Sequence, residues 1–355
     1  MVRRTLERFL AVGVVGLCLH AAAFGIAHAA SVRTKALHPP VVEGRWVRPA
    51  SEVPARPVWG HAKGLQVALW PGTPGPRGLL CVFAPHVGTP DRHAINFIAV
   101  EPIVTRRRGF SELEWSGLDH TRGKRMWTAD DASDAAPRDP THPARGVVAT
   151  AGGVETLTVF VYVEPFTNGA RPYLAMTFRA DRPEEVGLAT FAQPGSVPMK
   201  TCILTATMGN YARLRRLHLA TRVVTAGDLW PGFTGNGFAP HVRFPLADLA
   251  RLPDGSAMVC ATSDEADPTA AEYADGTPPW WQYRGAVATQ YWRAADPAPG
   301  LVAQVNGRVS YWSVHKPIPG GVSYENFELV APFEPGRTFG FGVTRRRPEE
   351  ILADP

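Results

Sequence analysis

The chain contains 355 residues, of which 45% are hydrophobic and 19% are charged, and its formal net charge at pH 7 is +5. Hydrophobic residues at this level exclude an intrinsically disordered protein, and the 34 glycines and 34 prolines are typical of a chain with many loops. Basic and acidic residues are well mixed, so the charge gives little support for a nucleic-acid partner, for which a clustered basic stripe is expected.

Residues 1–30 have the features of a cleavable secretory signal peptide. Three arginines give a positive start, an apolar run follows, and an A-x-A motif ends at Ala29. A membrane anchor is the alternative, but His20 interrupts the run, which is shorter than the ~20 residues of a spanning helix. No later apolar run is long enough to span a bilayer. We therefore expect a periplasmic or extracellular protein with no stable membrane span after cleavage.

The rest of the chain is expected to form one large domain. Residues 31–58 are rich in Pro, Val and Arg without a clear period, and we expect an extended N-terminal lead-in. The strand-like part covers residues 59–345, and residues 346–355 are expected to form a C-terminal tail. Residues 128–147 are rich in Asp and Pro and predict a long exposed loop.

Strand-like segments follow one another at short spacing along this domain. The clearest are residues 156–164 and 173–179, where apolar and polar side chains alternate as in antiparallel strands with one buried face. Two short segments, 245–252 and 267–274, have a helical pattern. Further predicted strands cover residues 64–70, 78–83, 95–103, 187–191, 201–208, 257–262, 285–292, 309–314, 323–331 and 338–344. The pattern favours an all-β, antiparallel sandwich or supersandwich with few short helices.

Three cysteines remain after removal of the signal peptide, Cys81, Cys202 and Cys260. At most one disulfide can form among them within one chain, and all three lie in apolar, strand-like text. We expect buried structural cysteines. No C-x-x-C, H-x-H or H-E-x-x-H spacing is present, so the sequence predicts no metal site, and it indicates no other cofactor.

A first candidate site lies after the turn at Gly209-Asn210. In an extended chain Tyr211, Arg213 and Arg215 point to the same side, and His218 follows. Arginine binds carboxylate or sulfate groups, and Tyr or His can transfer a proton, which is the equipment of a uronate lyase. The alternative is a solvated strand face whose arginines pair with surface carboxylates.

Two histidines occur in identical surroundings. The pentapeptide Phe-Ala-Pro-His-Val places His86 and His241 in equivalent contexts, which indicates either a duplicated unit or shared turn chemistry. Each is a candidate general acid or base, because His titrates near neutral pH. The alternative is a loop histidine that bonds to the backbone.

An acidic group lies close to three consecutive arginines, Arg106–Arg108. Its members are Glu101, Glu112, Glu114 and Asp119. Paired carboxylates perform glycoside hydrolysis, although the distance between strands cannot be read from one sequence. The alternative is a solvated face with ion pairs.

Aromatic residues are concentrated between residues 280 and 312. Trp280, Trp281, Tyr283 and Trp292 are candidate substrate-binding residues, because aromatic faces stack on sugar rings. Packing in the core is the alternative.

From Gly320 to Val343 the sequence has the pattern of a strand, a Pro-Gly turn and a closing strand. The segments concerned are Tyr324–Glu328, Pro335-Gly336 and Thr338–Val343. This part resembles the C-terminal region of galactose-mutarotase-like, carbohydrate-active β-supersandwich proteins. The resemblance implies Glu325 as general base and a mid-chain histidine as acid. The family's usual His-x-Tyr motif is absent, so the acid stays open between His218 and His241, and an ordinary strand carboxylate at position 325 is the alternative.

These observations predict an exported protein that binds and processes a glycan or polysaccharide. A lyase or epimerase would use Tyr211, Arg213 and His218 or His241 with Glu325, whereas a hydrolase would use a carboxylate pair. A non-catalytic glycan-binding or cell-envelope protein and a partner-binding scaffold are the alternatives. The sequence indicates no oligomeric state.

Overall fold

The structure is a computed structural model, and its described residues belong to the unit Pro39–Pro355. The described residues are 41–50, 57–88, 93–133, 135–137, 139, 142–207, 212–264, 272–273, 275, 283, 285–311 and 316–353. The predicted signal peptide lies outside these ranges. Within them, no helix combines the length and the apolar character needed to span a bilayer.

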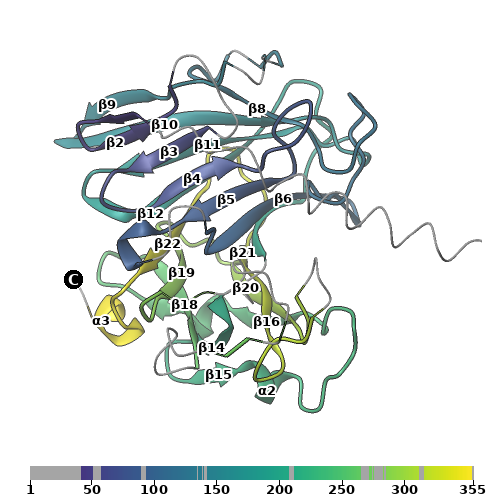
Figure 1. Cartoon of the computed structure of the whole chain (residues 1–355), viewed down its shortest axis with the longest axis vertical. Helices are drawn as coiled ribbons and strands as arrows, with labels where there is room; N and C mark the ends of the chain where they lie inside the picture. Colours follow the sequence, from purple (N-terminus) through teal and green to yellow (C-terminus); the bar gives the residue numbers. More distant parts are fainter. Residues whose placement is uncertain are drawn as a thin grey trace, which may run out of the picture. The chain divides into compact units, whose positions relative to one another are not determined.

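Two large antiparallel sheets dominate the described part of the chain, which confirms the prediction of an all-β sandwich (Figure 1). In the first sheet the strands lie in the order β1-β2-β3-β4-β5-β6-β13-β21-β20-β16, and β7 pairs with β6. Their bounds are β1 (Val41–Glu43), β2 (Trp46–Arg48), β3 (Val58–His61), β4 (Gln66–Leu69), β5 (Leu79–Phe83), β6 (Asn96–Val104), β7 (Arg107–Arg108), β13 (Thr201–Thr207), β16 (Val242–Pro245), β20 (Val302–Arg308) and β21 (Ser323–Val330).

The second sheet has the order β15-β14-β18-β19-β22-β12-β11-β10-β8, with β17 on β18 and β9 on β10. Its strands are β8 (Met126–Ala129), β9 (Val147–Ala151), β10 (Val154–Val163), β11 (Pro172–Arg179), β12 (Arg182–Ala192), β14 (Leu214–His218), β15 (Val223–Thr225), β17 (Ala250–Arg251), β18 (Ala257–Ser263), β19 (Thr289–Ala294) and β22 (Thr338–Thr344). The helical turns are η1 (Pro85–Val87), α2 (Ala226–Leu229), η3 (Leu246–Asp248) and α3 (Pro348–Leu352).

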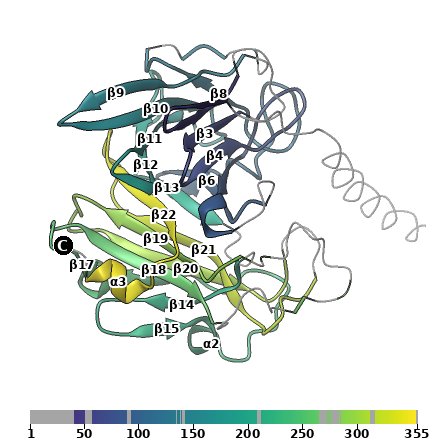
Figure 2. The same ribbon diagram turned by 60° about the vertical axis from the view of Figure 1, so that its left-hand side comes forward.

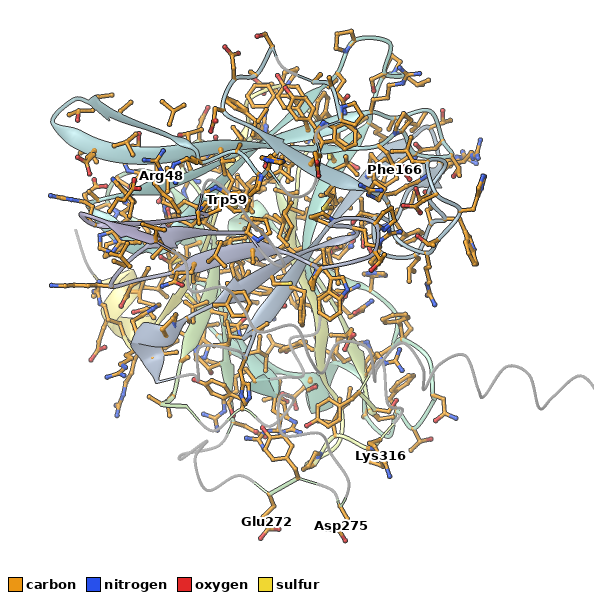
Figure 3. All side chains as sticks on the ribbon, turned by 45° about the horizontal axis from the view of Figure 1, so that its top comes forward. Arg48, Trp59, Phe166, Glu272, Asp275 and Lys316 are labelled. Carbon is orange, nitrogen blue, oxygen red and sulfur yellow. The ribbon has the colours of Figure 1, made fainter. Side chains whose placement is uncertain are left out.

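Alternation of side chains along the strands builds the core between the sheets. In β11 every second residue is buried, and Leu174, Met176 and Phe178 join the same apolar cluster as Val67 of the first sheet. Trp59 of β3 is completely buried, and its indole N–H donates a hydrogen bond to the Ala144 carbonyl, 3.1 Å away (Figure 3). The predicted alternation in residues 156–164 and 173–179 is therefore confirmed.

Both sheets continue from the N-terminal strands into the C-terminal strands. In the first sheet β13 lies between β6 and β21, and in the second sheet β12 pairs with β22 (Figure 2). In each sheet, a strand from the N-terminal part of the chain pairs directly with a strand from the C-terminal part. The described chain therefore has one continuous two-layer framework.

Some elements differ from the sequence-based expectation. Residues 245–252 form the short turn η3 and strand β17 instead of a helix, and within 309–314 only Ser310 makes a bridge, to Pro317, among the described positions. The predicted helix 267–274 lies mostly outside the described residues. The lead-in supplies β1 and β2 to the first sheet, and the tail contains α3.

Two glycines of β22 lie beneath large side chains of neighbouring strands. A Cβ atom at Gly342 would be 2.0 Å from Cζ of Tyr291, and one at Gly340 would be 2.6 Å from the carboxyl carbon of Glu185. Glycine is therefore needed at these two positions by close packing.

The three cysteines of the described residues are buried, and none of them forms a disulfide bond. Burial raises the pKa of the Cys202 thiol to about 12, and it also raises the pKa of Cys260. This agrees with the prediction that they are structural residues.

Candidate acid–base site

A row of polar side chains crosses the outer face of the first sheet. Glu328 lies between the core residues Phe327 and Leu329, and Gln304 lies between Ala303 and Val305. Because side chains alternate along a strand, each polar residue points away from the core. We call this row the polar stripe. Its members are Glu101, Arg108, Thr205, His241, Arg243, Gln304, Asn306, Asn326 and Glu328.

At its buried end the polar stripe consists of two carboxylates that share one arginine. Arg108 of β7 forms an ion pair with Glu101 of β6 and lies 3.5 Å from Oε1 of Glu328 on β21. The same guanidinium nitrogen is 3.5 Å from the Thr205 hydroxyl oxygen on β13. Glu101 is 2% exposed and Glu328 is completely buried. Four strands thus hold one guanidinium group between two buried carboxyl groups.

The stripe continues from Glu328 to the edge of the sheet. Gln304 of β20 donates a hydrogen bond to Oε1 of Glu328, and its own side-chain oxygen accepts one from Nε of Arg243, 2.6 Å away. Beside this row, the backbone N–H of Asn326 donates a hydrogen bond to Oδ1 of Asn306, 3.0 Å away. The Nδ2 atom of Asn306 lies 3.3 Å from Nε2 of His241. These contacts connect the buried carboxylates to β16.

Exposure increases along the stripe. Gln304 and Asn306 are buried, whereas His241 and Arg243 at strand β16 are exposed. Among the described residues β16 pairs with β20 alone, so it forms an edge of the sheet. Solvent therefore reaches the stripe from the β16 end.

Several buried oxygen atoms of the site have no hydrogen-bond partner among the described residues. They are Oε2 of Glu328, Oδ1 of Asn326 and Oε2 of the nearby Glu112. A buried acceptor without a partner costs free energy, typically about 1–3 kcal/mol.

Burial changes the proton affinities of the site. It raises the pKa of the Glu101 carboxyl well above its usual range, opposed by Arg108 and assisted by the nearby carboxyl groups of Glu112 and Glu328. It also raises the pKa of Glu112 to about 7. Desolvation lowers the pKa of His241, and the Glu328 carboxylate opposes that change. The site therefore combines a carboxyl group, Glu101, whose pKa is raised with a histidine, His241, whose pKa is lowered.

The candidate set after the Gly209-Asn210 turn has a different arrangement from the expected common face. The buried guanidinium of Arg213 lies 4.6 Å from the ring centroid of Tyr273. Arg215 forms an ion pair with Asp264 at 2.9 Å and donates to the Val322 carbonyl. Tyr211 lies outside the described residues. Both arginines are therefore engaged by other parts of the chain.

The predicted histidines are not gathered in one place. His218 is on β14 of the second sheet, where its Nε2 lies 2.9 Å from Oγ1 of Thr262. The Nε2 atom of His86 lies 2.9 Å from the carbonyl oxygen of Val343. His241 alone of these three belongs to the polar stripe. The repeated pentapeptide therefore has unlike surroundings in its two copies.

Glu325 is buried on β21, the strand that carries Glu328. Its charge acts on Arg308, where it opposes the lowering of the arginine pKa by burial. The histidine and the second carboxylate of the stripe interact with Glu328 instead.

The described members of the aromatic candidate set are largely buried. Trp292 is completely buried, and its indole N–H donates a hydrogen bond to the Phe327 carbonyl, 2.8 Å away. The ring centroids of Trp292 and Phe341 are 4.9 Å apart. The Tyr283 hydroxyl donates to the Ala286 carbonyl. Trp280 and Trp281 lie outside the described residues.

A second aromatic row, which the sequence did not reveal, crosses the outer face of the second sheet. Trp127, Tyr162, Tyr173 and Phe191 stack in turn, with centroid distances of 6.1, 5.0 and 5.0 Å. Because the rings cover one another's faces, the row is a packing element and offers no open ring face between its members.

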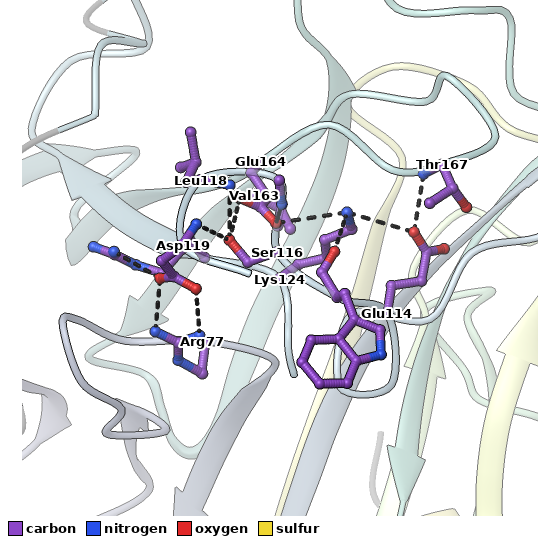
Figure 4. Close-up of polar contacts among 12 residues, drawn as sticks. Arg77, Glu114, Ser116, Leu118, Asp119, Lys124, Val163, Glu164 and Thr167 are labelled. Atoms are coloured by element: carbon purple, nitrogen blue, oxygen red, sulfur yellow. Dashed lines mark hydrogen bonds and ion pairs between the residues drawn. The ribbon is translucent and has the colours of Figure 1, made fainter. Parts of the chain in front are cut away.

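The acidic candidates separate into two groups. Glu101 and Glu112 belong to the surroundings of the stripe, whereas Glu114 and Asp119 take part in a partly buried ion-pair network (Figure 4). Burial alone would raise the pKa of Asp119, but hydrogen bonds from arginine and threonine side chains outweigh it and hold that pKa well below its usual range.

Glu328 is named in the sequence pattern only as part of the C-terminal segment, and Gln304, Asn306 and Arg243 were not candidates. The available signal was a polar residue between two apolar ones in several strands.

In the described part of the chain no group of three or more His, Cys, Asp or Glu side chains is arranged to hold a metal ion. Searches of protein-family models, curated proteins and solved structures returned no match to this chain.

Proposed function

We propose that the protein is an exported carbohydrate-active enzyme whose polar stripe performs acid–base chemistry on a glycan. One observation carries this proposal: the completely buried Glu328 has an unpartnered oxygen and shares Arg108 with Glu101, a carboxyl group whose pKa is raised by burial. Strongly perturbed carboxyl groups with a specific charge partner are typical of catalytic sites.

Two carboxyl groups with different proton affinities can act as an acid and a base. We assign Glu101 as the proton donor, because burial raises its pKa. Glu328 is the second catalytic carboxylate and acts through Oε2, because Oε1 is occupied by Gln304 and Arg108. Arg108 holds both groups in position.

Hydrolysis fits this pair best. Glu101 gives its proton to the glycosidic oxygen as the bond from that oxygen to the sugar carbon breaks and Glu328 bonds to that carbon. Water then bonds to the carbon as Glu328 leaves it, and the proton of this water returns to Glu101, which restores both groups. The two carboxyl groups contact the same arginine nitrogen, as the short separation of this two-step mechanism requires. The lyase arrangement receives less support, because Arg213 and Arg215 contact other parts of the chain.

The test begins with the mature protein and a set of neutral and anionic polysaccharides, with reducing-end and unsaturated products measured. We expect reducing ends, and we expect Glu328→Gln to lower the rate by on the order of 100-fold or more while the fold is retained. Glu185→Gln is the matched control, because it removes a buried carboxylate that pairs with Arg293 on the other sheet.

The competing assignment is tested with Glu325→Gln, which should keep the activity if Glu328 is the second catalytic carboxylate. Full activity in Glu328→Gln would refute the proposed site. Binding of a polysaccharide without any product would identify a binding protein instead of an enzyme.

A further inference from the structure

An exposed tryptophan lies beside an exposed arginine on the segment that connects β7 to β8. Trp115 is 66% exposed and forms an isolated antiparallel bridge with Arg122. Directly opposed residues of an antiparallel bridge point to the same side of the backbone. No carboxylate of the described residues forms an ion pair with Arg122. The two side chains therefore present a ring face and a guanidinium group together.

Buried charges hold the backbone of Trp115 in place. The Lys124 ammonium donates a hydrogen bond to the Trp115 carbonyl at 2.9 Å and lies 3.5 Å from carboxylate oxygens of both Glu114 and Glu164 (Figure 4). The lysine is 2% exposed, and its ammonium nitrogen lies 6.0 Å from the ring centroid of Phe166.

The residues after Trp115 are fixed in the same way. Glu164 accepts hydrogen bonds from the Ser116 hydroxyl at 2.9 Å and from the Gly117 amide at 3.1 Å. Asp119 pairs with Arg77 and Arg125, at 2.9 and 3.1 Å. A side chain on an ordered backbone loses less conformational entropy on binding than one on a mobile loop. The exposed ring is thus preorganised for a contact.

Glu112 connects this pair electrostatically to the polar stripe. Glu112, three residues before Trp115, has a pKa that is raised by burial and is lowered by both Arg108 and Arg122. Glu112 in turn contributes to the raised pKa of Glu101. The electrostatic connection extends from Arg122 through Glu112 to the buried carboxyl pair.

We propose that Trp115 and Arg122 form a subsite for an acidic sugar of the glycan, a uronate or a sulfated pyranose; this inference rests on the proposed function. An indole face packs on the C–H face of a pyranose, and a guanidinium fork binds a carboxylate or sulfate with two parallel hydrogen bonds.

The size of the patch fits a sugar better than a protein. Within the described loop the large exposed hydrophobic residues are Trp115 and Leu118. A stable protein interface buries about 800 Å² on each partner, which two side chains cannot supply. A single sugar ring matches the area and the charge.

Calorimetry with three hexasaccharides tests the inference: oligogalacturonate, a carrageenan hexamer, whose acidic groups are all sulfates, and neutral cellohexaose. We expect one of the acidic probes to bind, and which one binds distinguishes a uronate from a sulfate. Arg122→Gln should weaken that binding about tenfold, equal to about 1.4 kcal/mol, and should leave any binding of cellohexaose unchanged. Trp115→Ala should weaken it by a similar factor. Added salt should weaken acidic binding in the wild type more than in Arg122→Gln.

The matched controls are Val223→Ala and Arg251→Gln, which alter exposed residues of the second sheet and should bind like the wild type. Wild-type affinity in both loop variants, or no acidic probe bound at all, would overturn the subsite. Equal binding of polyglutamate would also overturn it, because the site would then recognise charge without a sugar. If Glu328→Gln keeps its activity while Arg122→Gln loses acidic binding, the proposed function fails and the subsite stands.

Discussion

Glu112 is a carboxyl group whose proton affinity depends on its surroundings. It is held close to Arg108 and Arg122, yet burial raises its pKa to about 7. The fold therefore favours the protonated form of this carboxyl group.

The first residue-scale prediction concerns this group. A carboxyl group with a higher pKa in the folded than in the unfolded chain stabilises the fold below its ordinary pKa of 4.5, and that stabilisation is lost as the pH rises through about 7. We expect the free energy of unfolding to fall by up to about 3 kcal/mol over this interval, at about 1.4 kcal/mol per pKa unit. Glu112→Gln should remove this part of the fall.

Urea titrations at several pH values measure the effect. Glu349→Gln, at an exposed position on α3, is the control and should follow the wild type. A Glu112→Gln protein with the full wild-type pH dependence would contradict the burial of this group.

At the residue scale the sequence pointed to part of the site. It named Glu101, Glu112 and His241 from residue type and neighbourhood. It gave Glu328 no separate role, because its importance depends on an arginine 220 positions earlier that reaches it across the sheet. Pairing of distant strands decides which polar side chains meet, and one sequence carries no direct signal of it.

At the scale of elements, strand β22 needs glycine at two positions because neighbouring side chains fill the space above them. Its pairing places Gly342 opposite Tyr291 of β19, and Tyr291 packs with Met258, Cys260 and Ile351. The tyrosine ring occupies the space that a side chain at position 342 would need.

We expect Gly342→Ala to destabilise the protein by about 3 kcal/mol, because the new methyl group would overlap a ring that is packed on its other sides. Thermal and urea unfolding measure this loss. Gly237→Ala, where no atom lies within 4 Å of the added Cβ, is the control and should be nearly neutral. Tyr291→Ala combined with Gly342→Ala should cost less than the sum of the single changes, and strict additivity would argue against the clash.

Element prediction succeeded where alternation was long. Residues 156–164 and 173–179 appear as β10 and β11, because one face meets the core. The sequence did not predict strand β20, because the polar residues Gln304 and Asn306 interrupt its apolar pattern. Both residues are nevertheless buried in the structure. The helical pattern of residues 245–252 was overridden by pairing of β17 with β18.

For the whole molecule, the important property is the continuity of both sheets. Strands from the two halves of the chain pair directly in each layer, through β13 and β21 in one and through β12 and β22 in the other. If the strands of one half unfolded, the strands of the other half that pair with them would have an exposed, unpaired edge.

We therefore expect one cooperative unfolding transition. The three cysteines report on it from different places, because Cys81 is on β5, Cys202 on β13 and Cys260 on β18. Their reaction with a thiol reagent should be slow in the folded protein and should rise at the same urea concentration at which tryptophan fluorescence changes. Two separate transitions would contradict the unity of the framework.

The general architecture was accessible from the sequence because it depends on local patterns repeated many times. The boundaries were less accessible: the lead-in contains two strands, and the tail places Ile351 against Tyr291 and Cys260. Such docking depends on complementary surfaces elsewhere in the chain.

The edge position of β16 has a further consequence. A foreign strand that added to this edge would cover the end at which His241 and Arg243 meet solvent. Pro245 has no amide hydrogen to offer such a strand, and the exposed charge of Arg243 discourages apolar contact. Pro245 and Arg243, which disfavour the addition of a strand at this edge, would therefore also keep the solvent-exposed end of the polar stripe accessible.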